Sequence, residues 1–280
     1  MKRFRYICCS LLVIALIVNG CKKSNFGEEF FLTPGKQYDM AVEGGFNTLT
    51  ISQYIRLTKP SLNPDSVPAP IRKASIVVND GRVNIVYKES ATPGVYVGIF
   101  RGDPNYNNAY KLTIKYDGKS YIAVDTLRQV VNIVDDFLPL STRINVEKNV
   151  EGNIPKHTFG YLNPNKWYIS YGETPFWNPS KFDQTNYYSY THFLGSPNSL
   201  YPLNNLKRAF TLRPEEFIYI YKISLSRKYS QYLYSVFMET DWNGLFSGVP
   251  VNVDGNVSGN VQGFFSVVDV DFRRYRAKEL

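Results

Sequence analysis

The side chains that could carry out catalysis are few in this chain, and their spacing does not suit it. The two histidines, His157 and His192, have no partner at the spacing of a zinc-binding His-Glu-x-x-His motif. Ser247 lies between glycines without forming the Gly-x-Ser-x-Gly elbow of esterases. The acidic pairs at 135–136 and 215–216 are adjacent, so on strands their carboxylates would point to opposite faces. We therefore predict no enzyme, no metal site and no cofactor, with a hydrolase as a minor alternative.

Cys21 is the residue for which the sequence does predict chemistry. A basic start and the apolar residues 7–18 precede it, which is typical of an export signal and too short to span a bilayer. The Val-Asn-Gly-Cys sequence at 18–21 is similar to a lipobox, in which the chain is cut before a cysteine that carries lipid. We predict a signal peptide over 1–20, lipidation of Cys21 and a tether over 21–35. The alternative is an ordinary signal that leaves Cys21 as a free thiol.

The cysteine and charge counts narrow the class of protein further. The other cysteines, Cys8 and Cys9, lie inside the predicted signal, so no disulfide is expected in the mature chain. Removing the signal reduces the basic residues from 32 to 29 against 24 acidic ones, so the net charge falls from +8 to +5. These charges are scattered and form no long basic run, so we predict no nucleic-acid partner.

Residues 36–126 consist of short apolar segments separated by turns. Asn79-Asp80-Gly81 and Asp117-Gly118 supply the positive φ angles of tight hairpins. About seven strands at this spacing predict an immunoglobulin-like β-sandwich, although the disulfide and core tryptophan of antibody domains are absent. We predict that this domain spans 36–126 and that a crossover follows over 127–150.

Residues 151–280 predict a second β-rich domain with one packed amphipathic helix. Apolar residues spaced three and four apart indicate that helix near 226–239, with Ser226 as its cap. An Asn-Val-x-Gly sequence repeats three times over 252–263. Its glycines predict a string of turns or a bulged hairpin, and a surface loop that grips a ligand is the alternative. The expected fold class is therefore all-β.

Residues 159–201 are unusually rich in aromatic and amide side chains. Rigid rings beside amides make good recognition surfaces, because little side-chain entropy is lost on contact. The alternative is that these rings close one end of a sheet. The candidate ligand-binding residues are Trp167, Trp177, Tyr187, Tyr188 and Tyr190.

Four groups of residues carry a resemblance to a known family. They are the sequence ending at Cys21, the segments 42–45 and 71–78, the segments 93–96, 110–114 and 121–123, and the helix at 229–237 with the segment 263–266. In these the chain resembles a domain-of-unknown-function family of Bacteroidetes-type outer-membrane lipoproteins. Such proteins are typically encoded beside TonB-dependent receptors. The resemblance implies a surface partner of a transporter and supplies no catalytic residues.

Together these features predict an outer-membrane lipoprotein, anchored by lipid and with the cell surface as the favoured face. The expected role is that of a non-catalytic accessory or ligand-binding partner of a TonB-dependent transporter, with a glycan or a peptide as ligand. The alternative is a structural or adhesive cell-surface protein.

Overall fold

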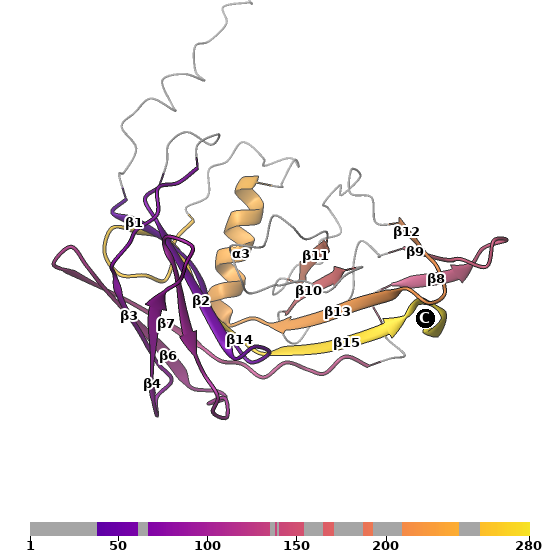
Figure 1. The fold of residues 1–280 in the computed structure, drawn as a ribbon, viewed down its shortest axis with the longest axis horizontal. Helices are drawn as coiled ribbons and strands as arrows, with labels where there is room; N and C mark the ends of the chain where they lie inside the picture. Colours follow the sequence, from indigo (N-terminus) through magenta and orange to yellow (C-terminus); the bar gives the residue numbers. More distant parts are fainter. Residues whose placement is uncertain are drawn as a thin grey trace, which may run out of the picture. The chain divides into compact units, whose positions relative to one another are not determined.

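The computed structural model describes residues 38–60, 67–134, 138, 140–153, 165–170, 187–192, 209–240 and 253–280. Within these ranges the chain forms strands, one α-helix and a short terminal 3-10 helix (Figure 1). The prediction of an all-β fold with one packed helix is confirmed. The predicted signal and tether lie outside the described residues.

Seven strands of the predicted sandwich region and one later strand form one continuous eight-stranded sheet, in the order β14-β1-β2-β5-β4-β3-β6-β7. Its strands are β1 (Met40–Asn47), β2 (Ser52–Thr58), β3 (Ser75–Asn79), β4 (Asn84–Glu89), β5 (Val95–Ile99), β6 (Ala109–Tyr116), β7 (Lys119–Thr126) and β14 (Val261–Val268). The β6–β7 hairpin turns at Asp117 and Gly118, whose φ angles of 48° and 71° are the positive values that the Asp-Gly sequence predicts.

Strand β14 comes from the far end of the chain. Val261–Val268 runs parallel to β1, with Val42 opposite Gly263 and Phe46 opposite Val267. The predicted domain boundaries remain a prediction, but the large sheet includes eight residues from the predicted C-terminal domain. A glycine makes this pairing possible, because a Cβ at Gly263 would overlap the carbonyl oxygen of Val42.

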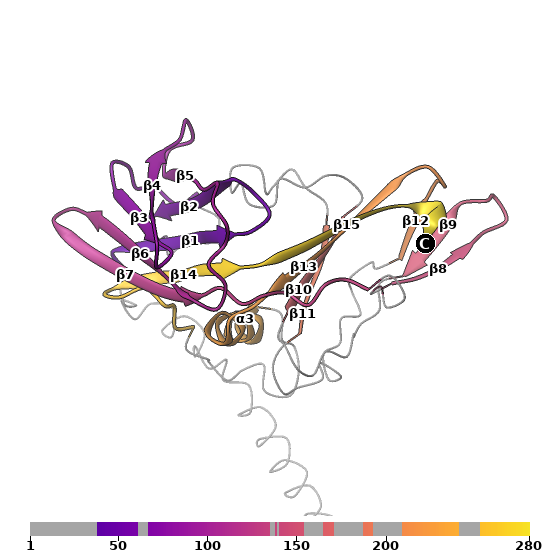
Figure 2. The ribbon, with the colours of Figure 1, turned by 90° about the horizontal axis from the view of Figure 1, so that it is seen from below.

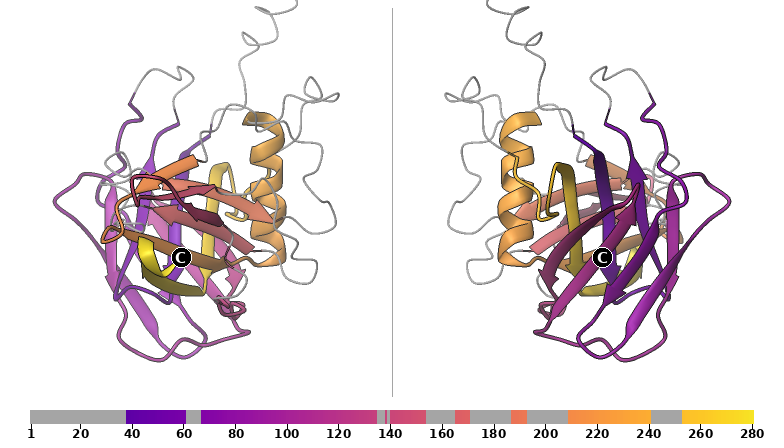
Figure 3. Two further views of the ribbon diagram at one scale, coloured as in Figure 1. Left: turned by 90° about the vertical axis from the view of Figure 1, so that its right-hand side faces the viewer. Right: turned by 90° about the vertical axis from the view of Figure 1, so that its left-hand side faces the viewer.

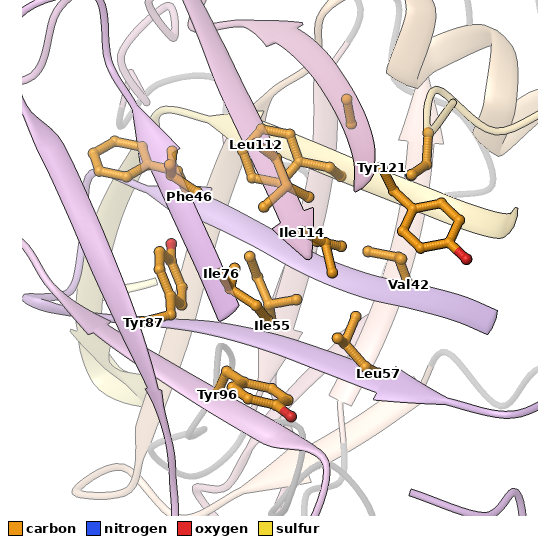
Figure 4. Packing of buried hydrophobic residues seen from close by; sticks show 14 of the residues in the cluster. Val42, Phe46, Ile55, Leu57, Ile76, Tyr87, Tyr96, Leu112, Ile114 and Tyr121 are labelled. Atoms are coloured by element: carbon orange, nitrogen blue, oxygen red, sulfur yellow. The ribbon is translucent and has the colours of Figure 1, made fainter. Parts of the chain in front are cut away.

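The main hydrophobic core lies inside the curl of this sheet. Alternate residues of its strands point inward, as the pleat of a strand requires. Figure 4 shows side chains from different strands of the sheet meeting there, among them Ile55, Tyr96 and Leu112, each at most 1% exposed. Phe265 and Val267 of β14 belong to the same core at 0% exposed, so the C-terminal part of the chain completes it.

The other described strands form two smaller sheets. A four-stranded sheet has the order β11-β10-β13-β15, and a three-stranded sheet has the order β12-β9-β8. Their strands are β8 (Ser141–Ile144), β9 (Val150–Asn153), β10 (Asn165–Ser170), β11 (Tyr187–His192), β12 (Ala209–Leu212), β13 (Phe217–Ser224) and β15 (Val270–Arg276), followed by the 3-10 helix η4 (Ala277–Glu279).

Asp269, between β14 and β15, joins the large sheet to the four-stranded sheet. Its buried carboxylate accepts hydrogen bonds from the Thr48 hydroxyl at 2.6 Å and from the Val130 backbone N–H at 2.8 Å. Its backbone exchanges two hydrogen bonds of 2.9 Å with Ser224 at the end of β13. Four segments far apart in the sequence therefore meet at this residue.

Helix α3 (Arg227–Thr240) matches the predicted helix closely. The Ser226 hydroxyl accepts the Tyr229 N–H at 3.0 Å, which is the predicted cap. The rings of Tyr229 and Tyr232 each lie 5.0 Å from that of Phe264 on the outer face of β14. Figure 2 shows the helix nearly end-on against this strand, and Figure 3 shows it beside the strands from two opposite sides.

Candidate functional site

A groove of about 620 Å³ lies between α3 and the outer faces of β7 and β14. Its walls are two residues of β7, one face of α3, a loop that precedes β14, and one ring of β14. The lining residues are Ile122, Val124, Lys228, Gln231, Tyr232, Ser235, residues 254–258 and Phe264.

The first wall follows from the alternation of β7. Tyr121, Ala123 and Asp125 point into the core, so Ile122 and Val124 face outward. Each of these two side chains is 38% exposed. They present apolar surface to the groove on a strand that β6 and the core hold firmly.

The second wall is the loop at 254–258, which contains the first three residues of the middle Asn-Val-x-Gly unit. The Asn256 amide donates to the Phe265 carbonyl at 2.8 Å and accepts the Phe265 N–H at 2.9 Å. On its other side Ser258 donates its N–H to the Ile122 carbonyl at 2.7 Å. The loop therefore bridges β14 and β7. Its backbone is fixed on both sides, as a preformed binding wall requires.

The third wall is the face of α3 that carries Lys228, Gln231, Tyr232 and Ser235. These residues are spaced three and four apart, so they lie in one row along the helix. Burial raises the pKa of the Tyr232 hydroxyl, the largest of the causes acting on it. Lys228 and Asp254 supply one charge of each sign, so the groove combines apolar patches with balanced polar groups.

Asp125 lies next to this groove, at the end of β7. It is 3% exposed, and its Oδ2 accepts the Val267 N–H at 2.9 Å. Burial raises the pKa of its carboxyl to about 6, against the smaller lowering effect of hydrogen bonds from Ser226, Val267 and Thr126. The pair of Asp125 and Ser226 fixes the start of α3 relative to the sheet, which is a positioning role.

The sequence-predicted aromatic residues that the structure describes lie elsewhere, on β10 and β11. Trp167 in β10 is 6% exposed and packs with Ile133 and Ile220, and the Lys222 ammonium lies 5.1 Å from its ring centroid. In the backbone register Trp167 is opposite Tyr190, Ile169 is opposite Tyr188, and Ser170 is opposite Tyr187. Trp177 and Cys21 lie outside the described residues. The structure thus gives Trp167 a packing position, and ligand contact by this group stays a prediction.

The sequence contains a signal for the groove, and it lies outside the aromatic segment at 159–201. Ile122 and Val124 are β-branched apolar residues at outward positions of a strand whose inward residues are Tyr121, Ala123 and Asp125. A strand that is apolar on its outer face needs a cover or a partner. Helix α3 covers only part of this apolar face, and nothing in the sequence indicates that the helix lies near β7.

Within the described ranges, no three or more His, Cys, Asp or Glu side chains are grouped so that they could hold a metal ion. In the same ranges no helix has both the length and the apolar character that crossing a bilayer requires.

Comparison with known proteins gives no family. No family model matches the chain, and no curated protein matches it. Among solved structures, two forms of a cytokine receptor complex align at 9% and 10% identity, with TM-scores of 0.22 and 0.23. They cover 85% and 66% of this chain and 96% and 91% of theirs. The chicken CNTN1 FN1–FN3 domains align at 9% identity and a TM-score of 0.24, over 65% of this chain and 59% of theirs. Likenesses of this size carry no argument about function.

Proposed function

We propose that this chain is a lipid-anchored, non-catalytic accessory protein of the outer membrane that partners a TonB-dependent transporter and faces the cell surface. The groove beside α3 is its binding site, for a segment of the transporter or for the glycan or peptide that the transporter takes up. The observation that carries the proposal is the groove itself, which has a loop wall hydrogen-bonded to β7 and β14, two outward apolar residues on β7 and balanced polar groups.

The lipid on Cys21 has a definite physical task in this proposal. Each methylene buried in the bilayer contributes about 0.8 kcal/mol, and several acyl chains together make the attachment stable. A protein held at the membrane meets a membrane partner at a much higher effective concentration than a free one does. Even a groove of moderate affinity then suffices for a lasting complex.

The anchor is tested with the variant Cys21→Ala. We expect the wild-type chain to fractionate with the outer membrane and its mature N-terminus to carry acyl groups by mass spectrometry. An unmodified thiol at Cys21, or a wild-type protein found free in periplasmic extract, would refute the anchor.

The partnership is tested by purifying the wild-type lipoprotein from its host in gentle detergent. We expect a receptor barrel to co-purify with it, and the variant Val124→Glu to lose that barrel because the charge lies in the groove. The matched control is Val86→Glu, since Val86 is an outward valine of β4 in the same sheet and is 60% exposed. Absence of a barrel, or equal recovery with both variants, would contradict the proposal.

A structural or adhesive role is the second candidate, and one observation favours it. In the β8–β9 hairpin Ile144 is 75% exposed and Val146 is fully exposed. Apolar side chains of this kind next to an edge strand are typical of surfaces that contact another protein. Loss of self-association or of surface attachment in Ile144→Asn, with receptor binding retained, would favour this role.

A further inference from the structure

One face of the four-stranded sheet carries a row of aromatic rings that is separate from the groove. Strands β13 and β15 run antiparallel, and residues directly opposite each other share a face. The pairs on this face are Phe217 with Arg276, Tyr219 with Arg274, and Tyr221 with Phe272. The ring of Phe272 is stacked on those of Tyr221 and Tyr219, with centroids 4.7 Å and 6.2 Å apart.

The row is buried at one end and partly exposed along the rest. Tyr221 is 3% exposed and packs against Phe272. Phe217, Tyr219 and Phe272 are half-buried, so each ring keeps part of its surface at the solvent boundary. Rings held in place by their neighbours lose little conformational entropy when a ligand contacts them.

Arg274 differs from the other cations near this row. Arg276 and Lys278 both pair with Glu215, at 3.7 and 2.9 Å, and Arg213 pairs with Glu216 at 2.9 Å. Among the described residues no carboxylate pairs with Arg274. Its guanidinium lies over the ring of Phe217, 4.8 Å from the centroid, and the Arg276 guanidinium lies 5.8 Å from the same centroid while also pairing with Glu215.

This arrangement prepares Arg274 to bind an anion. Stacking on a ring holds the plane of a guanidinium while its N–H groups stay available at the edge. Two parallel N–H donors match a carboxylate or a sulfate, and such charge-assisted bonds are about twice as strong as neutral ones. The site therefore combines ring surfaces with one oriented and unneutralised cation.

We propose that this face binds an acidic polysaccharide, whose sugar rings contact Tyr219 and Phe272 and whose carboxylate or sulfate contacts Arg274. Phe272 and Arg274 belong to β15, an end strand of the four-stranded sheet, but their side chains stand on the face of that sheet. An extended peptide would gain its backbone hydrogen bonds along the edge of β15, whereas sugar rings contact the aromatic face itself. The net charge of +5 that we predict for the mature chain favours an anionic partner over a neutral one. The inference is independent of the groove and of the transporter partnership.

The test measures binding of the full chain to polygalacturonate, dextran sulfate, neutral dextran and polyglutamate. We expect one or both acidic polysaccharides to bind, with polygalacturonate indicating a carboxylate ligand and dextran sulfate a sulfate ligand. Arg274→Gln should weaken that binding about 10-fold, as the loss of one charge-assisted pair implies. Tyr219→Leu should weaken it as well, with folding checked by circular dichroism.

Two control variants distinguish this site from general charge attraction and from the groove. Arg101→Gln removes another exposed arginine, located after β5, and should leave the affinity unchanged. Val124→Glu should also leave it unchanged, which separates this inference from the proposed function. Equal losses in Arg274→Gln and Arg101→Gln, polyglutamate binding as tight as that of the polysaccharides, or no binding of either acidic polysaccharide would each overturn the proposal.

Discussion

The backbone N–H of Val267 donates to the buried carboxylate of Asp125 at 2.9 Å, across the space between the two end strands of the large sheet. Strands β7 and β14 form no continuous ladder with each other. A carboxylate, the Asn256 amide and a single bridge between Ala123 and Val257 connect their edges instead. An exposed edge invites pairing with other chains, so these polar contacts protect the two ends of the sheet.

The buried carboxylate of Asp125, which links β7 to β14, should make the stability of the protein depend on pH. Burial raises the pKa of the Asp125 carboxyl from 3.8 to about 6, so between these values the folded chain holds its proton more tightly than the unfolded chain. Its contribution to stability is complete below pH 4 and is lost as the pH rises through 6, a change of about 3 kcal/mol at most. Urea unfolding of the wild type and of Asp125→Asn at pH 4 to 7 measures it.

The comparison between these two proteins isolates Asp125 from the other carboxylates. Hydrogen bonds lower the pKa values of the half-buried Glu151 and Glu216, which adds a slope of the opposite sign to both proteins. In Asp125→Asn we expect only that opposite slope, with stability gained relative to the wild type above pH 6. Parallel curves for the two proteins would show that Asp125 does not titrate as its burial implies.

Gly263 should be essential to the pairing of β14 with β1. Its φ is +97°, and a Cβ there would overlap the Val42 carbonyl oxygen. Gly263→Ala therefore combines backbone strain with a steric clash, and we expect a loss of about 2–4 kcal/mol in the free energy of unfolding. Gly118→Ala is the matched control, since its φ is +71° and a Cβ meets nothing within 4 Å, so about 1 kcal/mol is expected. If thermal or urea unfolding showed similar losses of stability in both variants, the predicted clash at Gly263 would be contradicted.

The sequence predicts local elements well and long-range pairing poorly in this chain. The Asp117-Gly118 turn and the Ser226 cap follow from neighbours within a few residues, and both are confirmed. The parallel pairing of β1 with β14 links Val42 to Gly263. No periodicity of either strand indicates that partner. Gly45 and Gly263 allow this close pairing. Glycine is also the usual residue of ordinary turns, so its presence does not indicate the partner strand.

The candidate site is likewise hard to predict, because it depends on long-range contacts. The high aromatic content of residues 159–201 predicts a binding surface there, yet Trp167 packs inside a hydrophobic cluster. The groove combines β7 with α3 and the loop at 254–258, both of which follow β7 by about a hundred residues or more in the chain. Outward apolar residues such as Val124 could have been read from the alternation of β7. That α3 lies over these residues depends on tertiary structure alone.

Trp167→Ala should destabilise the protein without affecting the aromatic row on β13 and β15. Trp167 is opposite Lys222, on the face of the sheet away from Tyr219 and Tyr221, so its loss leaves a cavity of indole size. We expect a loss of about 3–5 kcal/mol in urea unfolding and unchanged affinity for acidic polysaccharide.

Lys222→Met is the companion variant, because burial lowers the pKa of the Lys222 ammonium and the charge is therefore poorly solvated there. Asp271 keeps Arg273 at 3.6 Å and the Ile133 N–H at 2.6 Å as partners, so this change should alter stability by less than about 1 kcal/mol.

A Trp167→Ala variant of normal stability but weakened binding would instead give Trp167 the ligand contact that its sequence context suggested.

Asp269 should hold the large sheet and the four-stranded sheet in one cooperative unit. Its carboxylate accepts from Thr48, Tyr106 and Val130 at 2.6, 3.2 and 2.8 Å, and Asp269→Ala leaves all three donors without that acceptor. We expect a loss of about 3–5 kcal/mol in urea unfolding and faster hydrogen exchange at the Val130 amide. Asp254→Ala, at an exposed aspartate, should change stability by less than about 0.5 kcal/mol. If Asp269→Ala unfolds like that control, hydrogen bonding at Asp269 does not couple the two sheets, and the apolar contacts around Val268 must do so.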